Sequence, residues 1–239
     1  MPIFRLSEKM SFPPPHFAAA NGLLAIGGDL SRERLLIAYE NGIFPWYSPY
    51  DPILWWCPDP RLVLYPGQVH VPDRLRRTIK SGCFRVTSDT AFDQVIRQCA
   101  RVRLENNEET WLDDDMIEAY CRLHEDGFAH SVEIWQNGQL VGGLYGVCLG
   151  GCFFGESMFT RARDASKVAL VALCRHMEKN QFDMIDCQVA TAHLVWMGAR
   201  EVPRKAFLRQ LQTSLKKPTP RDKWVVSLPD FSGSGNDRY

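Results

Sequence analysis

The sequence predicts a mixed α/β fold of the α+β kind, preceded by a small N-terminal domain. From residue 61 onward, short apolar runs bounded by turn residues alternate with stretches whose apolar positions recur at helical spacing. Residues 1–60 lack this regularity and are rich in Pro, Gly and Trp. We therefore expect a small domain over residues 1–60, a main domain over 61–230, and a disordered tail over 231–239, which is rich in Ser and Gly.

Composition narrows the possible function classes. The chain has 239 residues, enough for one sizeable core, and carries 28 basic against 28 acidic side chains. This balance excludes a polycation, so any nucleic-acid contact must come from a local basic patch. No apolar run approaches the ~18 residues of a membrane span, and no signal peptide is visible, so we expect a cytoplasmic protein without membrane contact. Eight cysteines without a C-x-x-C pair indicate reduced thiols and no metal site.

The first part of the chain predicts one short helix followed by irregular structure. Ser31 is a favourable N-cap, apolar residues follow at helical spacing as far as Glu40, and Asn41-Gly42 is a typical helix terminator. Prolines then recur from Pro45 to Pro60. At this density of proline we expect no regular element.

The main domain predicts a β-meander followed by a helix and a parallel strand. Helices are expected over 73–80, 89–101, 113–126 and 164–179, with a last one opening at Pro203. Strands are expected over 131–135, 139–147, 152–158 and 183–189, with a tight turn at Asn137-Gly138. This order is typical of the acyltransferase-type (GNAT-like) mixed sheet core with flanking helices. By analogy of fold, the main domain is expected to be catalytic and to transfer an acyl group to an amine.

Two acidic residues stand inside segments that read as buried strands. Glu156 lies in the run from Phe153 to Phe159, and Asp186 lies two residues before Gln188 in the next predicted strand. A buried carboxylate costs several kcal/mol unless it is paired or hydrogen-bonded, so these positions predict a site that handles positive charge or protons. Backbone amides are one expected cap for Glu156. Asp186 and Gln188 should share one face of their strand.

A basic run and two tryptophans suggest contact with nucleic acid. Over residues 73–80, Leu75 and Ile79 should face inward at helical spacing. The cations of this run are Arg74, Arg76, Arg77 and Lys80. They predict either a phosphate-binding patch or an ordinary solvated face, and the sequence leaves both open. Trp46 and Trp111 lie in irregular, polar-flanked segments, where an indole ring is either part of the core or a platform for a nucleobase.

Several long motifs resemble one known family. The segments that carry the resemblance are Asn21 to Leu30 (NGLLAIGGDL), Gly42 to Trp46 (GIFPW), Leu54-Trp55-Trp56, Gly155 to Phe159 (GESMF) and Ile185 to Gln188 (IDCQ). In order and spacing they are similar to the leucyl/phenylalanyl-tRNA–protein transferases, over nearly the whole chain to about Lys216. The resemblance implies an enzyme that moves Leu, also Phe and less readily Met, from its tRNA to the N-terminal amine of proteins that begin with Arg or Lys. Such proteins are thereby marked for degradation.

The resemblance also implies site residues and partners. The partners are aminoacyl-tRNA and proteins with N-terminal Arg or Lys, and we expect a monomer without a cofactor. Glu156, Asp186 and Gln188 would be catalytic, and Trp46 and Trp111 would stack the terminal adenosine. The donor side chain would enter a pocket formed by Leu144, Met158, Leu173, Met177 and Ile185. Leu144, Leu173 and Met177 stand where the family pattern has Met, Phe and Phe, so the ranking of Leu against Phe stays open.

Because the donor ester is already activated, the protein mainly has to position the donor and the acceptor. The acceptor amine has an ordinary pKa of about 7.7–8 and is partly neutral at pH 7, so no strong base is required. We expect the Gln188 carbonyl to accept a hydrogen bond from the amine, Asp186 to orient the Gln188 amide, and Glu156 to balance the positive charge of the acceptor.

Two other functions fit parts of the sequence. A coenzyme A-dependent N-acetyltransferase fits the predicted fold, but residues 159–164 contain no Gly-x-Gly loop for a pyrophosphate. A non-catalytic RNA-binding protein would account for the basic run and the two tryptophans, but not for Glu156, Asp186 and Gln188.

Overall fold

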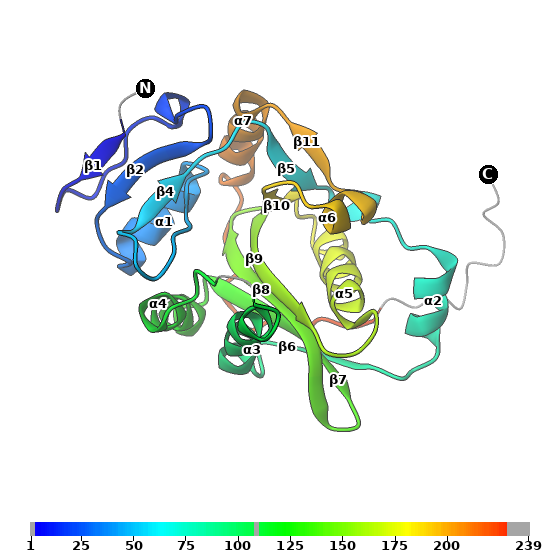
Figure 1. Cartoon of the computed structure of the whole chain (residues 1–239). Helices are drawn as coiled ribbons and strands as arrows, with labels where there is room; N and C mark the ends of the chain where they lie inside the picture. The colour runs from blue at the N-terminus through cyan, green and yellow to red at the C-terminus, as the bar shows by residue number, and fades with distance from the viewer. Residues whose placement is uncertain (1–2, 108–109, 229–239) are drawn as a thin grey trace.

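The computed structural model describes residues 3–107 and 110–228, which fold into two β-sheets with helices around them (Figure 1). One sheet has four strands in the order β1-β2-β4-β3, and the other has seven in the order β11-β5-β10-β9-β8-β7-β6. The predicted mixed α/β class is therefore confirmed. The predicted tail over 231–239 lies outside the described residues.

The N-terminal sheet forms where we expected irregular structure. Its elements are β1 (Phe4–Leu6), β2 (Leu23–Gly27), β3 (Phe44–Pro45), β4 (Leu54–Trp56) and the helix α1 (Arg32–Glu40). Phe44 pairs with Trp56 and Pro45 with Trp55 in an antiparallel ladder. Pro45 is compatible with this ladder because β3 is the edge strand of its sheet. The predicted helix is confirmed, with the Ser31 side chain accepting a hydrogen bond from the backbone N–H of Arg34.

The large sheet contains the predicted meander and parallel strand. Its strands are β5 (Arg61–Leu64), β6 (Arg85–Ser88), β7 (Ala129–Gln136), β8 (Gln139–Leu149), β9 (Cys152–Thr160), β10 (Met184–Gln188) and β11 (Arg200–Val202). Strands β7, β8 and β9 are antiparallel neighbours, and β10 runs parallel to β9 after the crossover helix α5 (Ala165–Lys179). The predicted acyltransferase-type arrangement is confirmed by this order. Strands β5, β6 and β11 were not predicted, because strands of three or four residues have too little periodicity to be recognised in the sequence.

Helices cover both faces of the large sheet. The remaining ones are α2 (Asp73–Lys80), α3 (Phe92–Glu105), α4 (Asp114–Glu125), α6 (Ala192–Trp196) and α7 (Arg204–Ser214), with 3-10 turns η1 (Pro15–Phe17) and η2 (Pro66–Gln68). A Cβ on Gly142 of β8 would touch Ala165 of α5, whereas one on Gly143 would touch Val95 of α3. Helices α5 and α3 therefore cover opposite faces, as Figure 1 shows. The predicted helix over 89–101 begins later, because Asp89 has a left-handed backbone (φ 54°) and its carboxylate is held by His130.

Two hydrophobic clusters fill the molecule, one on each face of the large sheet. One joins α3 and α4 to the N-terminal sheet, and the other surrounds α5. The expected boundary near residue 60 falls between β4 and β5, but the first cluster is continuous across it. The division into two domains stays a prediction.

The eight cysteines are free thiols, five of them buried. Over 3–107 and 110–228, no three His, Cys, Asp or Glu side chains lie where they could hold a metal ion. In the same ranges no helix has the length and apolar character to cross a membrane.

The bulge between β8 and β9 gives a test of the register. The ladder shifts between Tyr145 and Gly146, and a Cβ on Gly146 would lie 2.1 Å from the Phe154 carbonyl oxygen. We expect Gly146→Ala to lower the free energy of unfolding by about 3 kcal/mol, because a backbone atom cannot move aside cheaply. The control is Gly155→Ala, whose Cβ would meet nothing closer than 3.6 Å. Urea unfolding that shows equal losses for the two variants would contradict this register.

Candidate functional site

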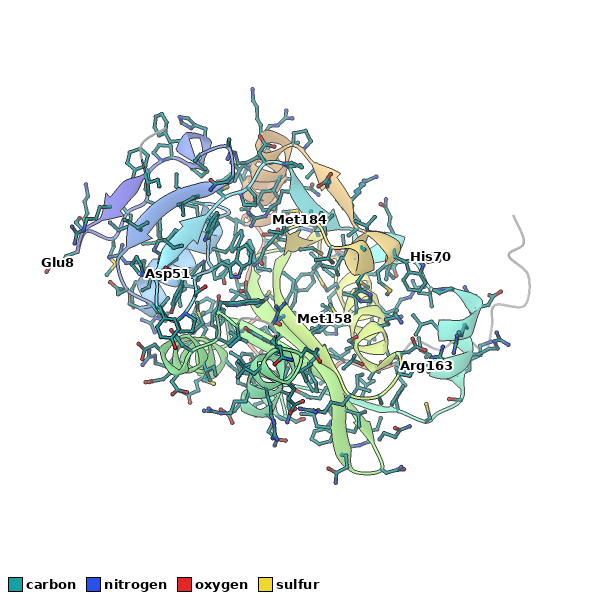
Figure 2. The ribbon with its side chains drawn as sticks, viewed as in Figure 1. Glu8, Asp51, His70, Met158, Arg163 and Met184 are labelled. Atoms are coloured by element: carbon teal, nitrogen blue, oxygen red, sulfur yellow. The ribbon has the colours of Figure 1, made fainter. Side chains whose placement is uncertain are left out.

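A cavity of about 320 Å³ opens between the large sheet, α5 and the segment that contains β3. One wall is apolar and comes from β8, β9, α5 and β10. Part of the lining is polar and includes the side chains of Glu156 and Gln188. Trp46, Trp111 and Arg103 line it as well. Figure 2 shows Met158, one of the apolar lining residues, near the middle of the molecule.

The apolar wall contains four of the five residues predicted for the donor pocket. Leu144, Met158, Leu173 and Ile185 line the cavity. Met177 does not. It is fully buried one turn further along α5, in the cluster that packs α5 on the sheet, so its place in the predicted pocket is wrong.

Several lining residues were not predicted from the sequence, among them the apolar Phe153, Leu170 and Leu194. Leu170 precedes Leu173 by one helical turn on the same face, and that spacing could have identified it. Leu194 lies on α6, a five-residue helix whose sequence gives no periodic signal.

Glu156 accepts three hydrogen bonds from side chains that come from three different elements. Tyr39 of α1 donates to Oε1 at 2.8 Å, Gln188 Nε2 donates to Oε1 at 2.9 Å, and Tyr120 of α4 donates to Oε2 at 3.0 Å. The two tyrosine hydroxyls also contact each other. The cap is thus made by hydroxyls and an amide rather than by the expected backbone amides. Neither tyrosine was predicted from the sequence.

Burial raises the pKa of Glu156 to about 7, although the hydrogen bonds from Tyr39, Tyr120 and Gln188 oppose the shift. The hydroxyl contacts agree with a carboxyl that gains a proton easily. Tyr39, Tyr120 and Glu156 make three mutual contacts, and two hydroxyl protons can fill only two of them. A proton on Glu156 supplies the third. The group can therefore exist in either charge state near neutral pH.

Asp186 is held in a buried ion pair with Arg61, the first residue of β5. Arg61 Nε lies 2.7 Å from Oδ1 and Nη2 lies 2.5 Å from Oδ2, and neither residue is exposed to solvent. The guanidinium lies 4.8 Å from the ring centres of both Phe44 and Phe207. The charge of Asp186 is thus compensated inside the protein, and its side chain does not line the cavity.

Asp186 and Gln188 do not share a strand face. Oδ1 of Asp186 accepts a hydrogen bond from the backbone N–H of Gln188 at 2.9 Å, the β-ladder shifts between these residues, and Gln188 has a left-handed backbone (φ 62°). Because this bulge breaks the two-residue alternation, the Gln188 side chain turns toward Glu156. The expectation that Asp186 orients the Gln188 amide is therefore wrong. Glu156 holds the amide, and Asp186 holds the backbone.

The two predicted aromatic platforms come together in the cavity wall. Their ring centres are 6.2 Å apart, nearly perpendicular, and Trp46 is 43% exposed. The Arg103 guanidinium lies 4.3 Å from the Trp111 ring centre. Arg103, which the analysis missed, adds a positive charge beside rings that were predicted to receive a nucleobase.

The predicted basic patch lies on α2, outside the cavity. Leu75 and Ile79 are buried as expected. Arg74, Arg77 and Lys80 are exposed, and Arg76 is half-buried. Helix α2 packs against α5, the helix that supplies part of the apolar wall.

Comparisons with known proteins agree on one family. A model of the leucyl/phenylalanyl-tRNA protein transferase family matches residues 63–212, and a model of its N-terminal domain matches residues 28–59. A protein of Desulforapulum autotrophicum with the name leucyl/phenylalanyl-tRNA–protein transferase is 56% identical over 227 residues, 95% of this chain and 99% of its own. A relative of the same name from Solidesulfovibrio magneticus is 57% identical and covers 95% of this chain and 92% of its own.

Solved structures are less similar to this chain than these relatives are. An aminoglycoside acetyltransferase from an uncultured soil metagenomic sample aligns at a TM-score of 0.38 with 13% identity, over 55% of this chain and 89% of its own. L-PGS from Bacillus licheniformis aligns at 0.37 with 9% identity, over 71% of this chain and 54% of its own. Scores this low support no statement about the present chain.

Replacement of Asp186 should lower the free energy of unfolding much more than replacement of Gln188. Asp186→Ala leaves the Arg61 charge buried and unpaired, so we expect it to lower the free energy of unfolding by about 3–5 kcal/mol. Gln188→Ala removes one hydrogen bond and should cost about 1 kcal/mol. Urea unfolding measures both variants. Small and equal losses would show that the Arg61–Asp186 pair does not support the fold.

Proposed function

The chain belongs to the leucyl/phenylalanyl-tRNA–protein transferase family, and on that premise we propose a role for each group around its cavity. The protein is an aminoacyltransferase. The observation that carries the residue roles is that one cavity joins an apolar pocket, two neighbouring indole rings and the Glu156–Gln188 pair.

The apolar wall receives the side chain of the donor amino acid. Burial of apolar surface contributes about 25 cal/mol per Å², so the pocket favours large apolar side chains such as Leu, Phe and Met. The terminal adenosine stacks on Trp46 and Trp111, beside the Arg103 charge. Phosphates that follow this adenosine contact the cations of α2, namely Arg74, Arg76, Arg77 and Lys80.

Gln188 guides the acceptor amine. Its Nε2 donates to Glu156, which leaves the amide oxygen to accept an N–H from the amine. The amine nitrogen then forms a bond to the ester carbonyl carbon, and the ester C–O bond breaks. The proton lost from nitrogen ends on the departing ribose oxygen. Asp186 and Arg61 are positioning residues in this scheme, because they fix the bulge that carries Gln188.

Glu156 recognises the positive charge of the acceptor. An ionised carboxylate in the lining of the cavity stabilises a cation beside it, which favours proteins that begin with Arg or Lys. Tyr39 and Tyr120 hold that carboxylate in place. Family membership decides against the coenzyme A and non-catalytic alternatives. Marking of the product for degradation, a monomeric state and a cytoplasmic location stay predictions.

Transfer of labelled Leu from charged tRNA to a peptide beginning with Arg tests this function. The matched control is the same peptide with an acetylated N-terminus, which cannot act as a nucleophile. We expect product only with the free amine. Absence of product, with acetylation from acetyl-coenzyme A instead, would overturn the proposal.

Replacement of Glu156 should change the pH dependence of transfer. Glu156 ionises as pH rises through about 7, so kcat/KM for a basic acceptor should rise over that range in the unmodified enzyme. Deprotonation of the acceptor amine adds a second rise near about 7.7–8. Glu156→Gln should lose the first rise and keep the second. An unchanged profile would contradict the proposed role.

Stability gives a second readout for the same variant. The native state holds a proton on Glu156 up to about pH 7, whereas the ordinary pKa is 4.5, so the native state binds more protons between these values. The free energy of unfolding should therefore fall as pH rises from 4.5 to 7, by at most about 3 kcal/mol from this group. Glu156→Gln should lack that component of the pH dependence.

The donor pocket can be tested with two Phe substitutions on α5. Leu173→Phe fills part of the cavity and should change the ranking of Leu-tRNA against Phe-tRNA, within the roughly 1–3 kcal/mol that such pockets discriminate. Met177→Phe, outside the cavity, should lower stability without changing the ranking. Competition between charged tRNAs measures the ranking. A change caused only by Met177→Phe would refute this pocket.

A further inference from the structure

We propose that a second, basic groove binds the sugar–phosphate backbone of the double-stranded part of the tRNA, an inference that rests on the function proposed above. The groove lies between α2, the C-terminal end of α5 and residues 217–228. Its cations are Arg76, Arg175, Lys179, Lys217 and Lys223. These residues define the basic groove below.

The basic groove is larger than the donor cavity, and most of its charged lining residues are cationic. Its volume is about 1,410 Å³, against about 320 Å³ for the donor cavity. Five cationic side chains line it and Asp222 is its one acidic lining residue among those described, in a chain with equal numbers of basic and acidic residues. Burial lowers the pKa of His176, so this lining residue adds no charge at neutral pH. The charge therefore fits a polyanion.

These cationic side chains can bind phosphate at little cost in free energy. Lys179 and Lys223 are exposed and form no ion pair with the residues that the structure describes. Arg175 pairs with Glu178 and Lys217 with Asp183, each at 2.6 Å and each substantially exposed. Exposed pairs of this kind are worth about 0–1 kcal/mol, so a phosphate can replace either carboxylate.

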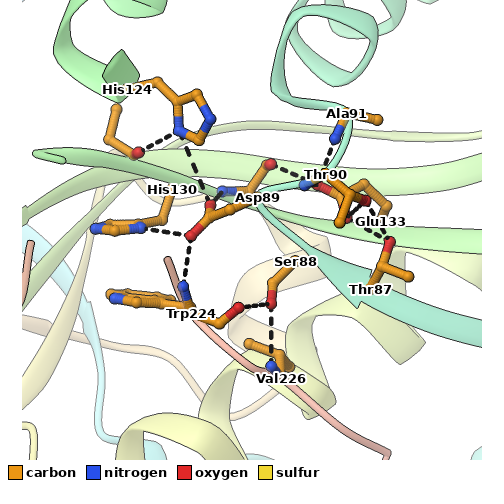
Figure 3. Close-up of polar contacts among 12 residues, drawn as sticks. Thr87, Ser88, Asp89, Thr90, Ala91, His124, His130, Glu133, Trp224 and Val226 are labelled. Carbon is orange, nitrogen blue, oxygen red and sulfur yellow. Dashed lines mark hydrogen bonds and ion pairs between the residues drawn. The ribbon is translucent and has the colours of Figure 1, made fainter. Parts of the chain in front are cut away.

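One wall of the basic groove is held in place by buried polar contacts (Figure 3). The backbone N–H of Trp224 donates to Asp89 Oδ2 at 2.8 Å, and the same oxygen lies 2.8 Å from His130 Nδ1. Although burial acts in the opposite direction, these hydrogen bonds hold the pKa of Asp89 below its ordinary value, so the carboxylate stays ionised. The Trp224 ring stacks on His130 with centres 4.1 Å apart.

Ser88 fixes the same segment at two further points. Its hydroxyl donates to the Trp224 carbonyl at 2.5 Å and accepts from the Val226 N–H at 3.0 Å (Figure 3). A wall anchored in this way is formed before any ligand arrives. The ordering cost of binding is correspondingly small.

The basic groove shares helices α2 and α5 with the proposed tRNA site. Arg76 lines the groove and belongs to α2, whose other cations were predicted to contact phosphate. Helix α5 carries Leu173 in the donor cavity and Lys179 in the basic groove, six residues and about 9 Å further along its axis. The cations come from three parts of the chain, namely α2, α5 and residues 217–228. This arrangement suits a long charged backbone, with one phosphate charge per about 1.7 Å of duplex axis, better than a single small anion.

The test uses Lys179→Gln/Lys223→Gln in the full-length protein. Each lost phosphate contact lowers the slope of log affinity against log salt by roughly 0.7–0.9, so the double variant should lose about 1.5 units of slope for whole tRNA. We expect KM for charged tRNA to rise about tenfold at low salt with kcat unchanged. Transfer from a leucyl-adenosine donor, which has no duplex, should stay unchanged.

The matched control is Lys205→Gln/Arg209→Gln, which removes the same charge from exposed positions on α7. Its salt slope and KM should equal those of the unmodified enzyme. Equal slopes for the groove and control variants would overturn the proposal. So would a groove variant that loses binding of inorganic phosphate but keeps its tRNA affinity, because the groove would then be a small-anion site. Failure of the function itself would appear differently, as no transfer from either donor by the unmodified enzyme.

Discussion

The buried ion pair between Arg61 and Asp186 is the constraint on which the site depends. Two charges at zero exposure are costly unless their geometry is complementary, and here the contact is bidentate, with Phe44 and Phe207 on the guanidinium. These contacts connect β5, β10, the N-terminal sheet and α7. They also leave one Asp186 oxygen on the backbone N–H of Gln188, where the strand bulges. The position of the Gln188 amide is therefore a consequence of a charge pair that does not line the cavity.

Glu156 is also a buried carboxylate, but unlike Asp186 it is not paired with a cation among the described residues. It is held by two hydroxyls and an amide, so burial raises its pKa to about 7. One acidic side chain is thus held in an ion pair inside the protein, while the other lines the cavity and can change charge near neutral pH. The sheet brings them together because β9 and β10 are adjacent and parallel.

Local sequence patterns predicted the meander, its Asn-Gly turn, the crossover helix and the parallel strand, because each has strong periodicity or a specific turn residue. They also identified Glu156 and Gln188 through polarity inside apolar strands. They could not identify Arg61, Tyr39 or Tyr120, since these lie between 36 and 125 positions from their partners and have no distinctive neighbours. The bulge at Gln188 was missed for a related reason. It depends on contacts between distant residues, whereas the usual alternation would have kept Gln188 on the same strand face as Asp186.

Residues from the N-terminal part reach the site at three points: Tyr39 contacts Glu156, Phe44 contacts Arg61, and Trp46 lines the cavity. A version of the protein cut to begin at β5 would lose all three, together with about a third of the buried residues of a continuous hydrophobic cluster. The same three contacts limit the exchange of the N-terminal part between related proteins. A chimaera can work only where the incoming segment supplies a hydroxyl, a phenyl ring and an indole at matching places. The N-terminal part can therefore be exchanged only for a segment that keeps these three contacts.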